Sequence, residues 1–186
     1  YCFGDTLELS PSITADSILW KGESILGNRN DKTIKALPQP GQKVYELQMW
    51  RSIQCKATDN IVVNVQGPLD NPDVTCIQVL NDSSITFTLD TLAPDTNFLY
   101  YNVYRQIGNG TIDRIDSIFN RTQVTYTDTT FDSFNDSIVN YYISTTNSCN
   151  LEGDTSLPRS TILFQYSILN DTTLALNWLD SNSSYN

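Results

Sequence analysis

The chemically reactive side chains of this 186-residue chain are four cysteines, seventeen aspartates and four glutamates, and the chain contains no histidine. Without histidine, neither a Ser-His-Asp nor a Cys-His nucleophile can be assembled, and most transition-metal sites lose their usual ligand. A glycoside hydrolase needs only two carboxyl groups, but the glutamates are scattered and nothing marks a pair among the aspartates. The sequence therefore predicts that this chain is not an enzyme.

The cysteines are Cys2, Cys55, Cys76 and Cys149. They form no C-x-x-C pair, so a zinc site is not indicated. A boundary near residue 67 separates them two and two, which favours one disulfide in each part, Cys2–Cys55 and Cys76–Cys149. Each bridge would close a long loop and stabilise the fold by about 4 kcal/mol, in an oxidising compartment. Trp20 is expected to pack against the first bridge. Free buried thiols are the alternative.

Short runs of β-branched and aromatic residues, bounded by turn residues, predict strands along the whole chain, and no segment keeps the period of a helix. Residues 1–67 are expected to form an immunoglobulin-like sandwich. The Pro-rich stretch "GPLDNPDV" predicts a short, stiff linker at 68–73. About seven strand-like runs follow and predict a fibronectin type III-like sandwich at 74–164. The predicted fold class is all-β, with tandem immunoglobulin-like and fibronectin type III-like sandwiches.

An internal repeat sets the period of the second region. The segment "VLNDSSITFTLD" from Val79 aligns without gaps with "ILNDTTLALNWLD" from Ile168, 89 residues later. Residues 165–186 are therefore expected to be the first strands of a further, truncated fibronectin-like domain. The aligned apolar residues all fall on one face of each strand: Ile85, Phe87 and Leu89 match Leu174, Leu176 and Trp178.

The formal charge of −10 comes mainly from aspartate, and no basic face is present for nucleic acid or anionic lipid. No apolar run is long enough to span a bilayer, so membrane insertion is not expected. The simplest interpretation of the acidity is a soluble surface. No cofactor is expected, although calcium at loop tips is an alternative. The aspartates in the expected loops are Asp70, Asp73, Asp82, Asp132 and Asp136.

Tyrosines concentrate on one predicted strand, "FLYYNVYR". Alternation puts Leu99, Tyr101 and Val103 on one face of this strand, and Tyr100, Asn102 and Tyr104 on the other, and part of the strand is expected in the core. The simpler interpretation of the outer tyrosines is a solvated sheet face. A sugar- or protein-binding strip is the alternative.

Two Ser/Thr motifs recur in the chain. Six N-x-S/T sites would accept N-glycans in a eukaryotic secreted protein. Aspartate followed by Ser or Thr, and then by an aliphatic residue or Thr, occurs seven times. One interpretation is that aspartate ends a turn and a β-former begins the next strand. The seven aspartates are Asp5, Asp16, Asp90, Asp116, Asp128, Asp136 and Asp171.

The segments "YCFGDTLELSPS" and "NIVVNV" resemble the immunoglobulin-like and PKD-like modules of large Bacteroidota surface proteins, and "FLYYNVYRQIGNGTIDRIDSI" and "VNYYISTTNSC" resemble the fibronectin-like modules that follow them. The resemblance implies export by the type IX secretion system, with a gliding-motility-associated C-terminal sorting domain that lies outside this chain. It also implies O-glycans on the residue after each motif aspartate. The implied acceptors are Thr6, Ser17, Thr91, Ser117, Thr129, Ser137 and Thr172.

The leading hypothesis is an O-glycosylated structural or adhesive segment of a large bacterial cell-surface or secreted protein, associated with gliding or with a filament. It would lie outside the cell or on the outer-membrane exterior. Its partners would be extracellular proteins, glycans or further copies of itself. Two alternatives are an accessory module of a secreted polysaccharide-degrading enzyme and a eukaryotic adhesion ectodomain.

Overall fold

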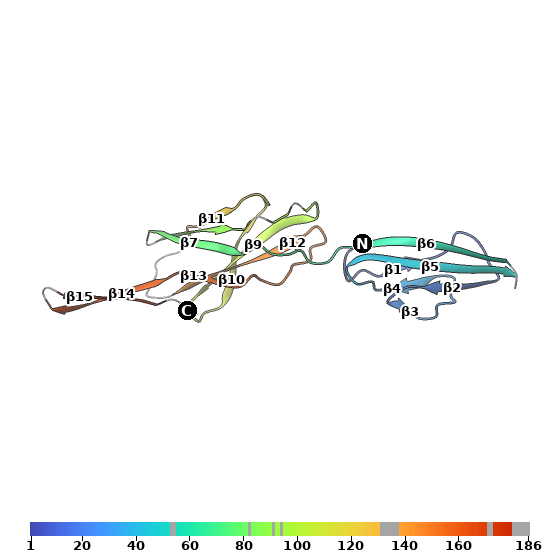
Figure 1. Cartoon of the computed structure of the whole chain (residues 1–186), viewed down its shortest axis with the longest axis horizontal. Helices are drawn as coiled ribbons and strands as arrows, with labels where there is room; N and C mark the ends of the chain where they lie inside the picture. Colours follow the sequence, from blue (N-terminus) through green and yellow to red (C-terminus); the bar gives the residue numbers. More distant parts are fainter. Residues whose placement is uncertain are drawn as a thin grey trace. The chain divides into compact units, whose positions relative to one another are not determined.

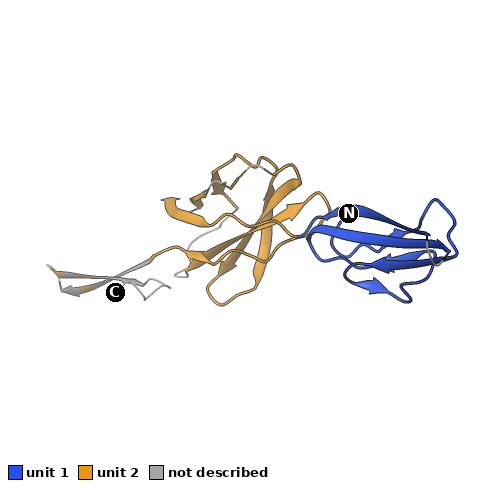
Figure 2. Ribbon diagram, turned by 45° about the vertical axis from the view of Figure 1, so that its right-hand side comes forward, with its two compact units in different colours: residues 1–67 blue, residues 68–186 orange. Residues whose placement is uncertain are grey.

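The computed structural model describes residues 1–52, 55–81, 83–90, 92–93, 95–130, 138–170 and 173–179. All regular elements in these ranges are β-strands (Figure 1), so the predicted all-β fold class is confirmed. No helix long and apolar enough to cross a membrane occurs in the described ranges. The chain divides into two compact units, Tyr1–Gly67 and Pro68–Asn186 (Figure 2).

Unit 1 contains six strands, which are β1 (Leu7–Leu9), β2 (Ser17–Lys21), β3 (Ile25–Leu26), β4 (Ile34–Ala36), β5 (Gly41–Ser52) and β6 (Cys55–Val65). They form two antiparallel sheets with the orders β1-β4-β3 and β2-β5-β6. Because side chains alternate across each strand, every second residue faces the opposing sheet. The resulting core consists of Leu7, Leu9, Trp20, Ile34, Ala36, Tyr45, Leu47, Met49, Val63 and Val65.

Tyr45 lies at the centre of this core and is 0% exposed. A side chain at Gly22 would overlap the Tyr45 ring, which explains why glycine follows β2 at this point. The Tyr45 hydroxyl and the Trp20 indole nitrogen are buried and have no hydrogen-bond partner among the described residues. Such unpaired buried groups lower the stability of the fold.

Strand β6 is the edge of its sheet along most of its length. At its C-terminal end the segment Tyr1–Phe3 lies against it in parallel, with the backbone N–H of Gln66 donating to the Tyr1 carbonyl and the Phe3 N–H donating to the Gln66 carbonyl, both at 2.8 Å. The Asn64 carbonyl also faces this segment, since it accepts from the Tyr1 amino group at 3.2 Å. Because backbone groups alternate in direction along an antiparallel strand, those of residues 56, 58, 60 and 62 face outward as well.

One of these outward groups is covered locally. The backbone N–H of Asn60 donates to the Asp59 carboxylate at 2.9 Å. Among the described residues, no strand pairs with the outer edge of β6 between 56 and 62. This part of unit 1 therefore presents an open strand edge, of the kind that can pair with another chain.

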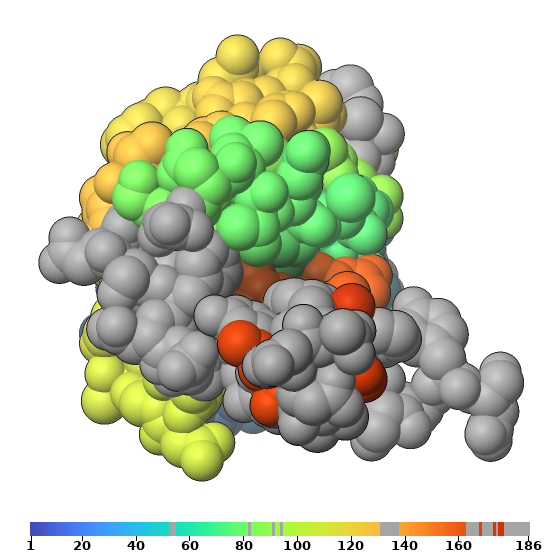
Figure 3. Space-filling view, turned by 90° about the vertical axis from the view of Figure 1, so that its left-hand side faces the viewer, coloured from blue at the N-terminus to red at the C-terminus, as the bar shows by residue number. Residues whose placement is uncertain are grey.

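Unit 2 begins with seven strands, which are β7 (Val74–Asn81), β8 (Ser84–Leu89), β9 (Phe98–Ile107), β10 (Ile112–Ile118), β11 (Thr125–Asp128), β12 (Val139–Asn147) and β13 (Arg159–Ser160). They form two antiparallel sheets with the orders β10-β9-β12-β13 and β11-β8-β7. The end-on view in Figure 3 shows the green β7–β8 atoms beside the yellow atoms of the region around β11. The core between the sheets consists of Val74, Ile85, Phe87, Leu89, Tyr101, Val103, Ile118, Val139, Tyr141 and Ile143.

Residues 68–73, predicted to be a linker, begin unit 2. Pro72 is buried. The Asn71 side chain accepts a hydrogen bond from the backbone N–H of Thr145 at 2.6 Å and donates to the Asp154 carbonyl. The Thr145 hydroxyl donates to the Asp70 carbonyl at 2.9 Å. These contacts fix residues 70–72 to β12. Here Asn71 occupies a hydrogen-bonding position and Pro72 a packing position.

A C-terminal hairpin of β14 (Leu163–Asn170) and β15 (Thr173–Leu179) follows. The bounds of β14 repeat those of β7 after a shift of 89 residues, and β15 ends one residue later than β8 does after the same shift. The register repeats from the turn out to Cys76–Thr88 and Gln165–Asn177, beyond which the pairs differ. Val79 pairs with Ile85 in the first hairpin, and Ile168 pairs with Leu174 in the second. Both hairpins also have a register irregularity at the same place, between Val79 and Asn81 and between Ile168 and Asn170. The repeat seen in the sequence is thus also a repeat of strand pairing.

Candidate modification and binding sites

The cysteines do not pair as predicted. Cys2 and Cys149 are disulfide-bonded, whereas Cys55 and Cys76 are exposed free thiols. The predicted bridges Cys2–Cys55 and Cys76–Cys149 are therefore wrong. Trp20 is in the core as expected, but it does not pack against the predicted bridge.

Strand β6 explains why Cys2 and Cys55 do not pair. Cys55 is the first residue of this strand. Cys2 forms a backbone β-bridge with Gln66, which follows the last residue of the strand. Eleven residues of extended chain separate these positions by about 35 Å. A disulfide requires Cα atoms within about 7 Å, so this pair cannot form in the folded unit.

Cys76 and Cys149 belong to different parts of unit 2. Cys76 lies on β7 opposite Thr88, and its neighbour Ile77 packs against the core. Alternation therefore directs Cys76 away from the core and toward solvent. Cys149 follows β12 in the other sheet, in a turn where its backbone N–H donates to the Asn147 side chain at 2.9 Å. The core separates the two sheets, so the two sulfur atoms do not meet.

Four of the seven predicted glycan acceptors lie in the described residues. Thr6, Ser17 and Thr129 are exposed, and Ser117 is half-buried. The other three, Thr91, Ser137 and Thr172, lie outside the described residues.

Three of the four corresponding aspartates hold local backbone structure. Asp5 accepts a hydrogen bond from the N–H of Cys2 at 3.0 Å, and Asp116 accepts one from the N–H of Ser117 at 2.7 Å. Asp128 accepts one from the N–H of Thr130 at 2.9 Å. The turn-into-strand interpretation fits Asp5, which precedes β1, but not Asp116, which lies inside β10, or Asp128, which is the last residue of β11.

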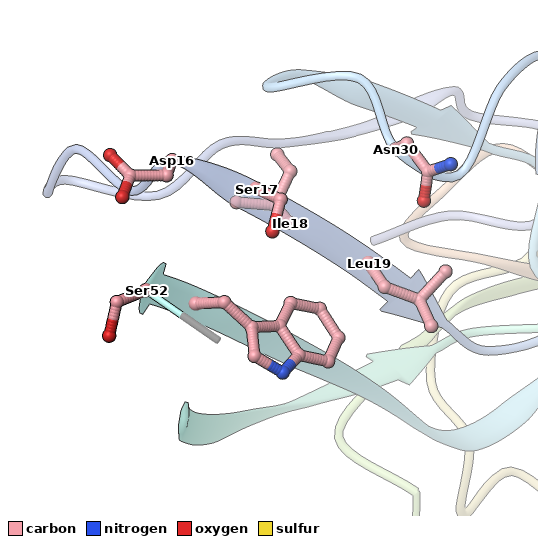
Figure 4. A pocket seen from close by; sticks show the side chains of 7 residues that line it. Asp16, Ser17, Ile18, Leu19, Asn30 and Ser52 are labelled. Carbon is pink, nitrogen blue, oxygen red and sulfur yellow. The ribbon is translucent and has the colours of Figure 1, made fainter. Parts of the chain in front are cut away.

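Asp16 is the exception, because its carboxylate makes no hydrogen bond with any described residue. It lies at the mouth of a groove of about 830 Å³ on unit 1 (Figure 4). The groove is lined by Ser17 and Leu19 from β2, Asn30 from the following loop, and Trp50 and Ser52 from β5. Nothing in the sequence indicates this site, because only the strand register brings these residues together.

The register places three side chains in one row across the sheet. Ser17 of β2 pairs with Trp50 of β5, and Trp50 pairs with Lys56 of β6. The Lys56 ammonium lies 5.6 Å from the centroid of the Trp50 ring, a favourable cation–π distance. All three residues point away from the core, since Met49 beside Trp50 belongs to it. Trp50 is half-buried, so part of its indole ring remains accessible.

Tyr104 and Tyr142 of unit 2 are each hydrogen-bonded to a neighbouring polar side chain. Tyr104 donates to the Glu152 carboxylate, and Tyr142 donates to the Gln106 side chain at 2.8 Å. The same Glu152 oxygen accepts from Asn102 at 3.0 Å. Burial raises the pKa of Glu152, but hydrogen bonds from Ser144, Tyr104 and Asn102 outweigh it and lower the pKa. These polar side chains bind one another and hold the loop after β12 in place.

A second polar cluster lies around Asp128, which is 0% exposed. Its carboxylate accepts from Arg105 at 2.7 Å, from the Tyr141 hydroxyl at 2.8 Å and from the Thr130 hydroxyl at 2.8 Å. Burial alone would raise the pKa of Asp128, but these bonds and the Thr130 N–H hold it below its usual value. The cluster ties β9, β11 and β12 together.

No group of three or more potential metal-ligating side chains occurs within the described ranges. Of the aspartates considered for calcium, Asp70 and Asp73 are exposed, and Asp82, Asp132 and Asp136 lie outside those ranges.

No protein-family model matches the sequence, and no curated protein matches it. Among solved structures, domains A168-A170 from titin share 13% identity with a TM-score of 0.52, covering 87% of this chain and 60% of that one. The FN1-FN3 domains of chicken CNTN1 give 12% identity and a TM-score of 0.45, covering 78% of this chain and 54% of that chain. A two-domain fibronectin type III segment from chicken tenascin gives 14% identity and a TM-score of 0.35, covering 84% of this chain and 90% of that chain. The chain thus spans less than two thirds of the length of the titin and CNTN1 structures. Its fold is that of tandem immunoglobulin-like and fibronectin type III-like sandwiches.

Proposed function

We propose that this chain is a structural and adhesive segment of a long extracellular protein built from tandem β-sandwiches. The observation that carries the proposal is the second hairpin. Strands β14 and β15 repeat the pairing of β7 and β8 after 89 residues, so the module that begins at β7 begins again at β14. Serial modules of this kind space and present surfaces, and each folds around its own core.

The absence of histidine and the hydrogen bonding of the Asp128 and Glu152 carboxylates support a non-enzymatic role. Both carboxylates accept hydrogen bonds from neighbouring polar side chains of unit 2.

The proposed source is a Bacteroidota cell-surface protein exported by the type IX system, with O-glycans at the Asp-Ser/Thr motifs. Exposure of Thr6, Ser17 and Thr129 supports modification of these residues. Glycans there would shield the surface from proteolysis and discourage strand-edge pairing. Its partners would be other extracellular proteins, glycans or further copies.

The test is intact-mass analysis and glycopeptide mapping of the protein isolated from its native source. We expect added hexose-containing mass on Thr6, Ser17 or Thr129, with the N-x-S/T asparagines unmodified. Glycans on the asparagines alone would contradict the bacterial assignment. An unmodified chain would contradict the glycan proposal, and the sequence flanking this segment would then decide between a surface array and a catalytic protein.

A further inference from the structure

The groove at Trp50 combines an aromatic wall with free polar groups. The wall is the half-buried indole of Trp50, and the floor is formed by Ser17 and Leu19 of β2. Asp16 lies at the start of β2, and Asn30 comes from the loop between β3 and β4 (Figure 4). The volume of about 830 Å³ lies within the range of small-ligand sites and would hold more than one sugar ring.

The polar groups of the groove differ from those elsewhere on the molecule. The side chains of Asp16, Ser17, Asn30 and Ser52 make no hydrogen bonds with any described residue. By contrast, three asparagine side chains elsewhere in the chain each accept a hydrogen bond from the backbone N–H two residues later. They are Asn28, Asn81 and Asn120. The groove thus keeps a carboxylate, an amide and two hydroxyls available for a ligand.

We propose that this groove is a carbohydrate-binding site, in which a pyranose ring lies against the Trp50 indole and its hydroxyl groups bond to Asp16 and Asn30. A pyranose has an apolar face of C–H bonds and a rim of hydroxyls, and the groove offers a partner for each. The apolar face would cover the indole ring. The rim would satisfy the carboxylate and the amide, both of which bond well to hydroxyl donors.

Other ligand classes fit this lining less well. A purely apolar ligand or peptide would desolvate Asp16 and Asn30 without replacing their hydrogen bonds to water. An anionic ligand would be repelled by Asp16, while the nearby cation Lys56 is already placed over the Trp50 ring. A neutral sugar meets neither obstacle.

The inference does not depend on the proposed O-glycosylation, although the two meet at Ser17. A glycan on Ser17 would itself occupy the groove, because Ser17 pairs directly with Trp50. The binding experiment therefore uses the full chain from an expression host that adds no glycans. Failure to bind sugar there would leave the glycan proposal untouched, and an unmodified native protein would leave the groove proposal untouched.

Isothermal titration calorimetry with cellohexaose, mannohexaose and chitohexaose tests the proposal. We expect at least one to bind, and Trp50→Ala to weaken that binding by about tenfold or more. Trp50→Phe should retain part of the affinity. Asp16→Asn and Asn30→Ala should each weaken binding by about fivefold, since each removes or alters a hydrogen bond to the sugar.

The matched control is Val44→Ala, on the same strand and the same sheet face but away from the groove, with 54% of Val44 exposed. It should bind as the unmodified chain does, and circular dichroism should confirm that all variants fold. The proposal would be overturned if none of the three sugars bound. It would also be overturned if Trp50→Ala bound normally while folded, or if the groove took up an apolar peptide and no sugar.

Discussion

The Arg105 guanidinium lies 2.7 Å from the carboxylate of Asp128, whose side chain is completely buried. Arg105 comes from β9 and Asp128 is the last residue of β11, so the ion pair joins the two sheets of unit 2. Breaking a buried pair by removing one partner leaves an uncompensated charge in the core.

Arg105→Met should therefore destabilise unit 2 by about 3 kcal/mol or more. The measurement is urea unfolding followed by fluorescence. Lys21→Met is the matched control, since its ion pair with Glu46 spans 3.2 Å with both side chains partly exposed. Such exposed pairs contribute little to stability. Equal losses of unfolding free energy in the two variants would show that the buried ion pair stabilises the fold no more than the exposed one does.

Lowering the pH should remove the contribution that the Asp128 carboxylate makes to folding stability. Its native pKa lies below the usual value, so it stabilises the fold above the unfolded-state pKa of about 3.9 and loses this as pH falls through the native pKa. Asp128→Asn should lower the Tm at neutral pH, and the difference from the unmodified chain should shrink below about pH 4. A difference that stayed constant down to pH 2 would contradict this assignment.

Two buried tyrosines should respond in opposite ways to loss of the hydroxyl. Tyr45 and Tyr141 are both 0% exposed, but the Tyr45 hydroxyl has no partner among the described residues, whereas that of Tyr141 donates to Asp128. Tyr45→Phe should leave stability unchanged or raise it by up to about 1 kcal/mol, and Tyr141→Phe should lower it by about 1–3 kcal/mol. Thermal and urea unfolding measure both, and a loss of stability in Tyr45→Phe would indicate a hidden partner.

The native protein should contain two reactive thiols. Cys55 and Cys76 are exposed and free, whereas Cys2 and Cys149 are disulfide-bonded. Titration with Ellman's reagent without denaturant should give about two equivalents, because only a free thiol reacts. Peptide mapping after alkylation should locate the label on Cys55 and Cys76. If none of the four cysteines reacted, the result would instead support the two disulfides predicted from the sequence.

The open edge of β6 should become more prone to association when Asp59 is removed. Its carboxylate covers the outward N–H of Asn60, and residues 1–67 carry seven basic and seven acidic side chains, so no net charge keeps two such units apart. Asp59→Ala should increase self-association in analytical ultracentrifugation and speed hydrogen exchange at Asn60. Asp31→Ala makes the same charge change in a loop and should associate no more than the unmodified chain does.

Local alternation predicted most of the strands and cores. Ile85, Phe87 and Leu89 face inward as predicted, and Tyr101 and Val103 share one buried face while Tyr104 lies on the other, but alternation did not say which of these two faces is the core. The failures concern contacts set by register. Cys55 is at the N-terminal end of β6 and Cys2 lies beside its C-terminal end. The number of cysteines in a sequence does not reveal how far apart two of them lie in the fold. The groove required Ser17 to meet Trp50, 33 positions later, and only the pairing of β2 with β5 brings them together.

The parallel contact between Tyr1–Phe3 and Gln66 has a mechanical consequence. A force that pulled the two ends of unit 1 apart would act in opposite directions along these neighbouring segments. The two backbone hydrogen bonds between them, both 2.8 Å, lie across the direction of pull. They would have to break together rather than one after another, because the load is shared between them. The ends of unit 1 therefore form a shear clamp, which resists tension before the core behind it is loaded.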